Sequence, residues 1–125
     1  MNVVDSSGWL EYFGDGKNAN FFARPIQDIE NLVVPTICIY EVFKRLSSLR
    51  DKEEALRAVG VMSLGHLIEL NRQLAMNAAK LSLDLKLALA DSVILATARA
   101  NEATLWTQDE HFKELDGVKF IEKKV

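Results

Sequence analysis

The chain of 125 residues carries 15 basic and 18 acidic side chains, for a formal net charge of −3, and 49% of its residues are hydrophobic. This apolar content excludes a disordered chain, and the length suits one domain over residues 1–125. The negative charge excludes a protein that holds nucleic acid by bulk positive charge. Binding to nucleic acid therefore needs another device, such as a cation that bridges carboxylates to phosphates.

The chain shows no sequence signal for export or membrane insertion. The first residues lack a basic segment followed by a long apolar run, and no stretch approaches the ~18 apolar residues of a membrane helix. The only cysteine, Cys38, lies in an apolar run, which predicts a small buried side chain. A single thiol also suits a reducing compartment. We therefore expect a cytoplasmic protein with no membrane partner.

Short apolar runs alternate with amphipathic segments along the chain. Runs of β-branched residues predict strands, and apolar residues repeating every three to four positions predict helices. In chain order, the predicted elements are a strand at 3–4, a helical turn or two near 9–13, a helix at 19–29 kinked or divided by Pro25, a strand at 32–34, helices at 37–49 and 52–61, a short strand at 66–70, helices at 70–85 and 92–100, a strand at 104–107, a short helix at 109–115 and a strand at 118–121. This alternation predicts a three-layer α/β/α sandwich around a central parallel sheet, with the strand order left open.

Three of these helices carry apolar residues at spacings that predict their buried faces. Thr36 is expected to cap the helix at 37–49. The residues expected to face the core are Tyr40, Phe43 and Leu46 in that helix, Ala55, Leu56, Val59 and Met62 in the next, and Leu70, Leu74, Ala78, Leu81 and Leu85 in the third.

Two acidic side chains follow predicted strands. Asp5 comes directly after the first strand, and Asp109 lies two residues after the fourth. Ligands of open α/β sheets bind beyond the carboxyl ends of the strands, so both carboxylates are expected at the same edge. Each of them alone is also explained as a helix cap.

Two further acidic side chains are isolated charges within apolar runs. Glu41 is the only charge between Ile37 and Phe43, and Asp91 is alone in the apolar stretch 87–95. Glu41 has a structural alternative in an ion pair with Arg45 one turn later, and Asp91 has one as a helix cap. Burying either carboxylate without a partner costs several kcal/mol, which favours a role for both at a shared site.

If these four carboxylates converge, a cation is required. Neighbouring negative charges raise one another's pKa unless a positive ion neutralises them. Oxygen ligands suit Mg²⁺ or Mn²⁺, and such an ion activates water and stabilises the leaving oxygen in phosphodiester hydrolysis. The pattern therefore indicates metal-dependent phosphodiester chemistry.

Four segments, at 3–7, 35–42, 89–98 and 105–112, resemble the PIN-domain ribonucleases and, among them, the VapC-type toxins of toxin–antitoxin pairs. The resemblance implies an α/β/α sandwich and endonucleolytic cleavage of RNA. It also implies a small antitoxin partner and a homodimer. The site residues that it implies are Asp5, Glu41, Asp91 and Asp109 as catalytic ligands of Mg²⁺ or Mn²⁺, with the hydroxyls of Ser6 and Thr107 in support.

Three other functions share part of this pattern. A non-catalytic PIN-like interaction module would not need all four acids, and a housekeeping RNA-processing nuclease of the same fold would keep them. An aspartyl-phosphate phosphatase is disfavoured because Ser7 stands where its second aspartate belongs. His66 and His111 are conceivable acid–base groups, but the family chemistry does not require them, and His111 is expected to face solvent. The few basic residues beside the motifs, which are Lys44, Arg45 and Arg99, indicate no path for RNA.

Overall fold

The computed structural model of residues 1–125 contains a five-stranded sheet in which all paired strands run parallel. The central strand β1 (Asn2–Val4) lies between β2 (Leu32–Pro35) and β4 (Thr104–Thr107), and β3 (His66–Ile68) and β5 (Val118–Phe120) form the edges. The sequence order of the strands therefore differs from their spatial order, because the chain returns across the sheet between β3 and β4.

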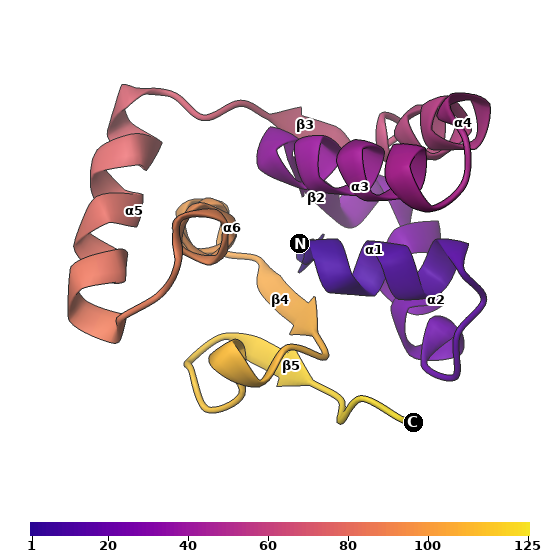
Figure 1. The fold of residues 1–125 in the computed structure, drawn as a ribbon. Coiled ribbons are helices and arrows are strands. Elements are labelled where there is room, and N and C mark those ends of the chain that lie inside the picture. The colour runs from indigo at the N-terminus through magenta and orange to yellow at the C-terminus, as the bar shows by residue number, and fades with distance from the viewer.

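Helices cover both faces of this sheet. They are α1 (Ser6–Phe13), α2 (Ala19–Gln27), α3 (Thr36–Leu49), α4 (Lys52–Met62), α5 (Arg72–Leu85) and α6 (Leu89–Ala100), with 3₁₀ turns η1 (Ile29–Asn31) and η2 (Glu110–Phe112). Figure 1 shows α5 and α6 on one side of the sheet, and α1, α2 and α4 on the other. The predicted α/β/α sandwich is confirmed.

The main core lies between the central strands and the helices on either side. Both β1 and β2 are buried over most of their length, and every residue of α6 from Ser92 to Ala98 is buried. Cys38 is fully buried as predicted, and this burial raises the pKa of its thiol. No helix is both long and apolar enough to cross a membrane.

Gly8 allows α1 to pack closely against β1 and α2. A Cβ atom at this position would lie 2.6 Å from a ring carbon of Phe22 and 2.7 Å from Cγ1 of Val4. These distances are shorter than van der Waals contact, so a larger residue would force α1 away from the sheet. The start of α1, which directly follows Asp5, is thereby fixed against β1.

Several predicted boundaries were wrong. The helix predicted at 92–100 begins at Leu89, so Asp91 lies inside its first turn instead of capping it. Thr36 is the first residue of α3, and Pro35 precedes it without a side-chain cap. Pro25 lies within the continuous helix α2, which ends at Gln27. The helix predicted at 109–115 is reduced to the short turn η2.

Three residues expected in the core are exposed, namely Tyr40 at 59%, Leu56 at 56% and Leu70 at 45%. The buried stripe of α3 consists of Cys38, Val42 and Leu46, spaced at whole helical turns. Tyr40 lies two positions from Cys38, about 200° around the helix, and therefore points to solvent. Leu70 precedes the first residue of α5 and takes no part in that helix's buried face.

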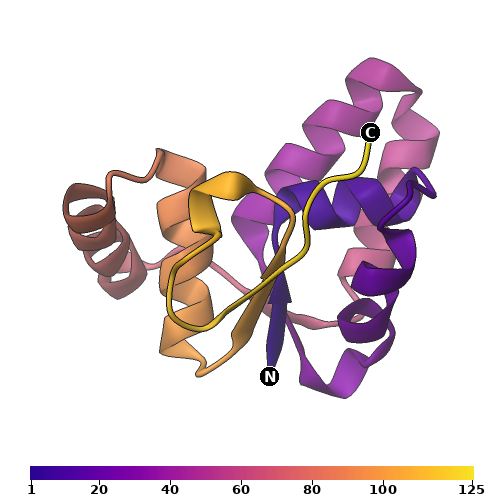
Figure 2. The ribbon, with the colours of Figure 1, turned by 90° about the horizontal axis from the view of Figure 1, so that it is seen from below.

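The end of the chain packs beside the connection between α1 and α2. Figure 2 shows the segment after β5 passing across the molecule to this side. The side chain of Asn18 donates a hydrogen bond to the carbonyl of Glu122 at 3.0 Å, and Lys17 contacts the carbonyl of Val125. The C-terminal segment is thus attached to the N-terminal part of the fold.

Candidate functional site

The structure brings the four acidic side chains to one cleft beyond the carboxyl ends of β1 and β4. The cleft has a volume of about 280 Å³, and its lining residues are Asp5, Ser6, Ser7, Leu10, Glu41, Arg45, Asp91, Ile94 and Asp109. Because β1 pairs with β4, the residues that follow these two strands are neighbours. Helices α3 and α6 supply the other two carboxylates.

Asp5 lies at the buried end of this cleft and is only 2% exposed. Its Oδ1 accepts hydrogen bonds from the backbone N–H of Gly8 and the hydroxyl of Ser7, both at 2.9 Å. Burial raises the pKa of Asp5 to about 6, against the lowering effect of these bonds and of the hydroxyl of Thr107. Asp5 is therefore the N-cap of α1 and a cleft residue at the same time, so its two sequence interpretations are compatible.

Thr107 connects two of the acidic positions. Its hydroxyl donates to Oδ2 of Asp5 at 2.5 Å and accepts from the backbone N–H of Asp109 at 2.9 Å. Thr107 is completely buried at the end of β4, which fixes the position of this hydroxyl. One side chain thus orients the carboxylate of Asp5 and the backbone at Asp109.

Glu41 is held by α1 and not by its own helix. The hydroxyl of Ser6 donates to Oε1 of Glu41 at 2.6 Å, which joins the first turn of α1 to α3. No ion pair forms between Glu41 and Arg45, so the structural alternative for this carboxylate is wrong. The hydrogen bond from Ser6 instead directs the carboxylate of Glu41 toward the acidic cleft.

Asp91 and Asp109 share a contact with His111. Nδ1 of His111 lies 3.4 Å from Oδ2 of Asp91 and 3.2 Å from Oδ1 of Asp109. Partial burial and the nearby charge of Asp109 raise the pKa of Asp91, and His111 acts in the opposite direction.

The ring of His111 is largely exposed, as expected, but its Nδ1 contacts two carboxylates of the cleft. The sequence signal for this contact is the spacing of two residues between Asp109 and His111. A capping aspartate bonds the N–H two residues later, and here that N–H belongs to His111, at 2.9 Å.

The donor atoms in this part of the cleft fit a divalent cation. One oxygen each from Asp91 and Asp109 and a nitrogen of His111 all lie within 4.8 Å of one another. An octahedral ion with bonds of about 2.1 Å places adjacent ligands about 3.0 Å apart and opposite ligands about 4.2 Å apart. The contacts of His111 with the two carboxylates are close to the first of these separations.

Comparison with known proteins gives one family and a set of similar structures. The family model of the PIN domain matches residues 3–118. A search of curated proteins found no relative of the chain.

Three solved structures illustrate the similarity. A toxin–antitoxin complex from Klebsiella pneumoniae has a TM-score of 0.81 at 21% identity, covering 95% of this chain and 96% of that one. VapC20 of Mycobacterium tuberculosis, described as a sarcin–ricin loop cleaving toxin, has a TM-score of 0.77 at 12% identity, covering 93% and 95%. VapBC2 from Rickettsia felis, bound to a DNA fragment from its promoter, has a TM-score of 0.74 at 15% identity, covering 97% of each chain. At these identities the likeness is one of fold.

Proposed function

Because the chain belongs to the PIN domain family, we propose that it is a divalent-metal-dependent endoribonuclease and the toxin of a toxin–antitoxin pair. The observation that carries this proposal is the meeting of Asp5, Glu41, Asp91 and Asp109 in one cleft, although they come from four separate segments of the chain. Residues 1–125 then form one nuclease domain that acts in the cytoplasm.

The four carboxylates are proposed to hold Mg²⁺ or Mn²⁺. Asp91 and Asp109 are more exposed than Asp5, and the nitrogen of His111 lies beside them. Such an ion, when bound, polarises a phosphoryl oxygen and makes a water molecule a better nucleophile. A cation in the cleft also favours the charged form of Asp5, which burial alone disfavours.

The hydroxyl groups around the cleft give the carboxylates their positions in advance. Thr107 and Ser7 orient Asp5, and Ser6 orients Glu41. A carboxylate that is already oriented needs little reorganisation when a cation and a phosphate arrive. Ser6 and Thr107 are therefore proposed as positioning residues of this site.

RNA is proposed as the substrate, and a small antitoxin and a second copy of the chain as partners. The M. tuberculosis structure is described as a sarcin–ricin loop cleaving toxin, and the K. pneumoniae structure is described as a toxin–antitoxin complex. These descriptions support the substrate and the antitoxin, and the PIN resemblance supports the homodimer.

Cleavage of a structured RNA by the purified protein tests the catalytic proposal. Wild type is expected to cleave with Mg²⁺ or Mn²⁺ and to stop when a chelator is added. Asp91→Asn is expected to retain its fold but to lose at least roughly 100-fold in RNA-cleaving activity, which is the effect typical of changes around metal sites. Asp84→Asn, at an exposed position of α5, is the matched control and keeps full activity. Cleavage that persists in chelator contradicts the proposal, and complete absence of cleavage favours the non-catalytic module.

Expression of the chain in cells tests the toxin proposal separately. Wild type expressed alone is expected to arrest growth, and co-expression of the neighbouring small gene is expected to relieve the arrest. Asp91→Asn serves as the inactive control. RNA cleavage in vitro without growth arrest would identify a housekeeping nuclease instead.

A further inference from the structure

One exposed face of α3 carries an aromatic ring, two cations and a hydroxyl next to the acidic cleft. Tyr40, Lys44 and Ser48 are spaced by four residues, so they lie along one side of the helix, with Arg45 adjacent. Together with Glu41 they line a hollow of about 230 Å³. We call Tyr40, Lys44, Arg45 and Ser48 the α3 track.

The α3 track is continuous with the acidic cleft. Glu41 and Arg45 line both the cleft and the hollow beside it. A linear polymer lying along the α3 track therefore reaches Glu41, at the edge of the cleft, without leaving the surface of α3.

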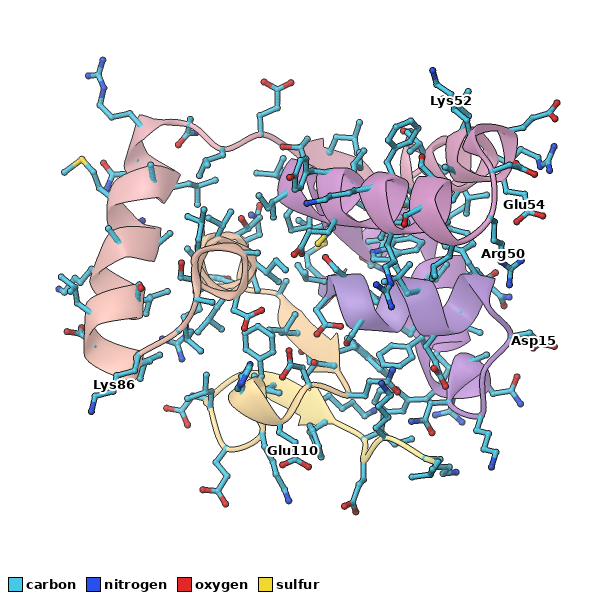
Figure 3. The ribbon with its side chains drawn as sticks, viewed as in Figure 1. Asp15, Arg50, Lys52, Glu54, Lys86 and Glu110 are labelled. Carbon is cyan, nitrogen blue, oxygen red and sulfur yellow. The ribbon has the colours of Figure 1, made fainter.

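The two cations of the α3 track have no acidic partner. Lys44 and Arg45 are exposed and form no ion pair, whereas Arg50, directly after the end of α3, is paired with Glu54 at 3.2 Å (Figure 3). In a chain with a net charge of −3, two free cations at the rim of an acidic cleft provide a local attraction for an anion. They therefore offset part of the repulsion between an approaching phosphate and the four carboxylates of the cleft.

Tyr40 adds a stacking surface to this charge. Its side chain is 59% exposed, and Nζ of Lys44 lies 5.6 Å from the centre of its ring. Exposed aromatic rings beside cations are a common means of binding single-stranded nucleic acid, because a base stacks on the ring while the cations contact phosphates.

We propose that the α3 track binds single-stranded RNA and leads it into the acidic cleft, with one base on the ring of Tyr40 and phosphates against Lys44 and Arg45. This inference rests on the proposed nuclease function. A protein partner fits a different hollow, beside Arg50, which is lined mostly by apolar residues of α1, α3 and α4. The α3 track has only one such residue, Tyr40.

Binding of a labelled single-stranded RNA of about 12 nucleotides, measured by fluorescence anisotropy in chelator, tests the inference without cleavage. Tyr40→Ala is expected to weaken binding about tenfold or more, and Tyr40→Phe to retain it. Lys44→Ala and Arg45→Ala are each expected to weaken binding and to reduce the slope of log K against log salt by about 0.7. Lys52→Ala is the matched control, because Lys52 points outward at the start of α4, away from the cleft (Figure 3).

Heparin, a polyanion without bases, separates stacking from charge. Tyr40→Ala is expected to bind heparin like wild type, whereas Lys44→Ala and Arg45→Ala bind it more weakly. Equal loss of RNA binding in Tyr40→Ala and Lys52→Ala, or no loss in Tyr40→Ala, overturns the inference. If the α3-track variants bind RNA like wild type but no longer form a complex with the product of the neighbouring gene, the face serves a protein partner. This result also overturns the inference.

The failure of this inference is distinguishable from failure of the proposed function. If wild type cleaves RNA with Mn²⁺ while the α3-track variants bind and cleave like wild type, the inference is wrong and the nuclease proposal stands. If wild type binds RNA through the α3 track but never cleaves it, the nuclease proposal is wrong and the inference stands. If wild type neither binds nor cleaves RNA, both are wrong.

Discussion

The ionised carboxylate of Asp5 is expected to destabilise the fold when no cation is bound, because the side chain is almost completely buried. Its pKa is about 6 in the folded protein and 3.8 in the unfolded chain, so the folded state binds more protons between these values. Stability therefore falls as pH rises from 4 to 6, by as much as about 3 kcal/mol. Below pH 3.8 the group is protonated in both states and this loss is absent.

Asp5→Asn is expected to remove this pH dependence. In chelator above pH 6, the variant should be about 1–3 kcal/mol more stable than wild type, the lower end reflecting a weaker hydrogen bond from Thr107. Urea unfolding of both proteins between pH 4 and 7 measures the difference, with Asp84→Asn as the control. Parallel stability curves for wild type and Asp5→Asn would show that burial does not raise the pKa of Asp5.

At the scale of elements, the packing of α1 depends on the absence of a side chain at Gly8. Gly8→Ala places a Cβ atom 2.6 Å from the ring of Phe22, and we expect it to destabilise the fold by about 1–3 kcal/mol. The variant should also cleave RNA more slowly, since α1 carries Ser6 and is capped by Asp5. Thermal unfolding and the cleavage assay measure the two effects.

Gly60 is the matched control for this change. It also lies within a helix, α4, but a Cβ atom there meets nothing within 4 Å. Gly60→Ala is expected to stabilise the fold by about 0.5–1 kcal/mol, because alanine loses less backbone entropy than glycine in a helix. Similar effects of the two substitutions would mean that the close approach of α1 is not required.

Local patterns were sufficient to predict most elements and the acidic residues of the cleft. A carboxylate directly after a strand, such as Asp5, is visible in the sequence because strand and acid are neighbours. The bond from Thr107 to Asp5 was not predictable, because it depends on β4 lying beside β1, and apolar runs do not encode strand order. The exposure of Tyr40 was missed for a related reason, since its apolar spacing fits two helix faces and only packing selects the one containing Cys38.

At the scale of the whole molecule, cation binding is expected to stabilise the fold by mass action. A ligand at 100 times its dissociation constant adds about 2.7 kcal/mol to the free energy of unfolding. Addition of Mg²⁺ or Mn²⁺ should therefore raise the melting temperature of wild type. Glu41→Gln should reduce this increment, because the variant contributes one fewer charge to the cleft.

The same thermal measurements on Asp84→Asn provide the control, since its carboxylate lies outside the cleft. An increment in Glu41→Gln equal to that of wild type would remove Glu41 from the cation site. A melting temperature of wild type that does not respond to either cation would contradict the metal proposal itself.

The pairing of β1 with β4 has a consequence for the stage of synthesis at which the acidic cleft can form. Asp5 is synthesised well before the residue whose hydroxyl orients it, because Thr107 lies 102 positions later. Nascent chains that lack β4 have neither this hydroxyl nor Asp109, and their β1 has a vacant edge. Such long-range pairing is also slow to form. A growing chain therefore cannot hold Asp5, Thr107 and Asp109 in their final arrangement until β4 has been made and has paired with β1.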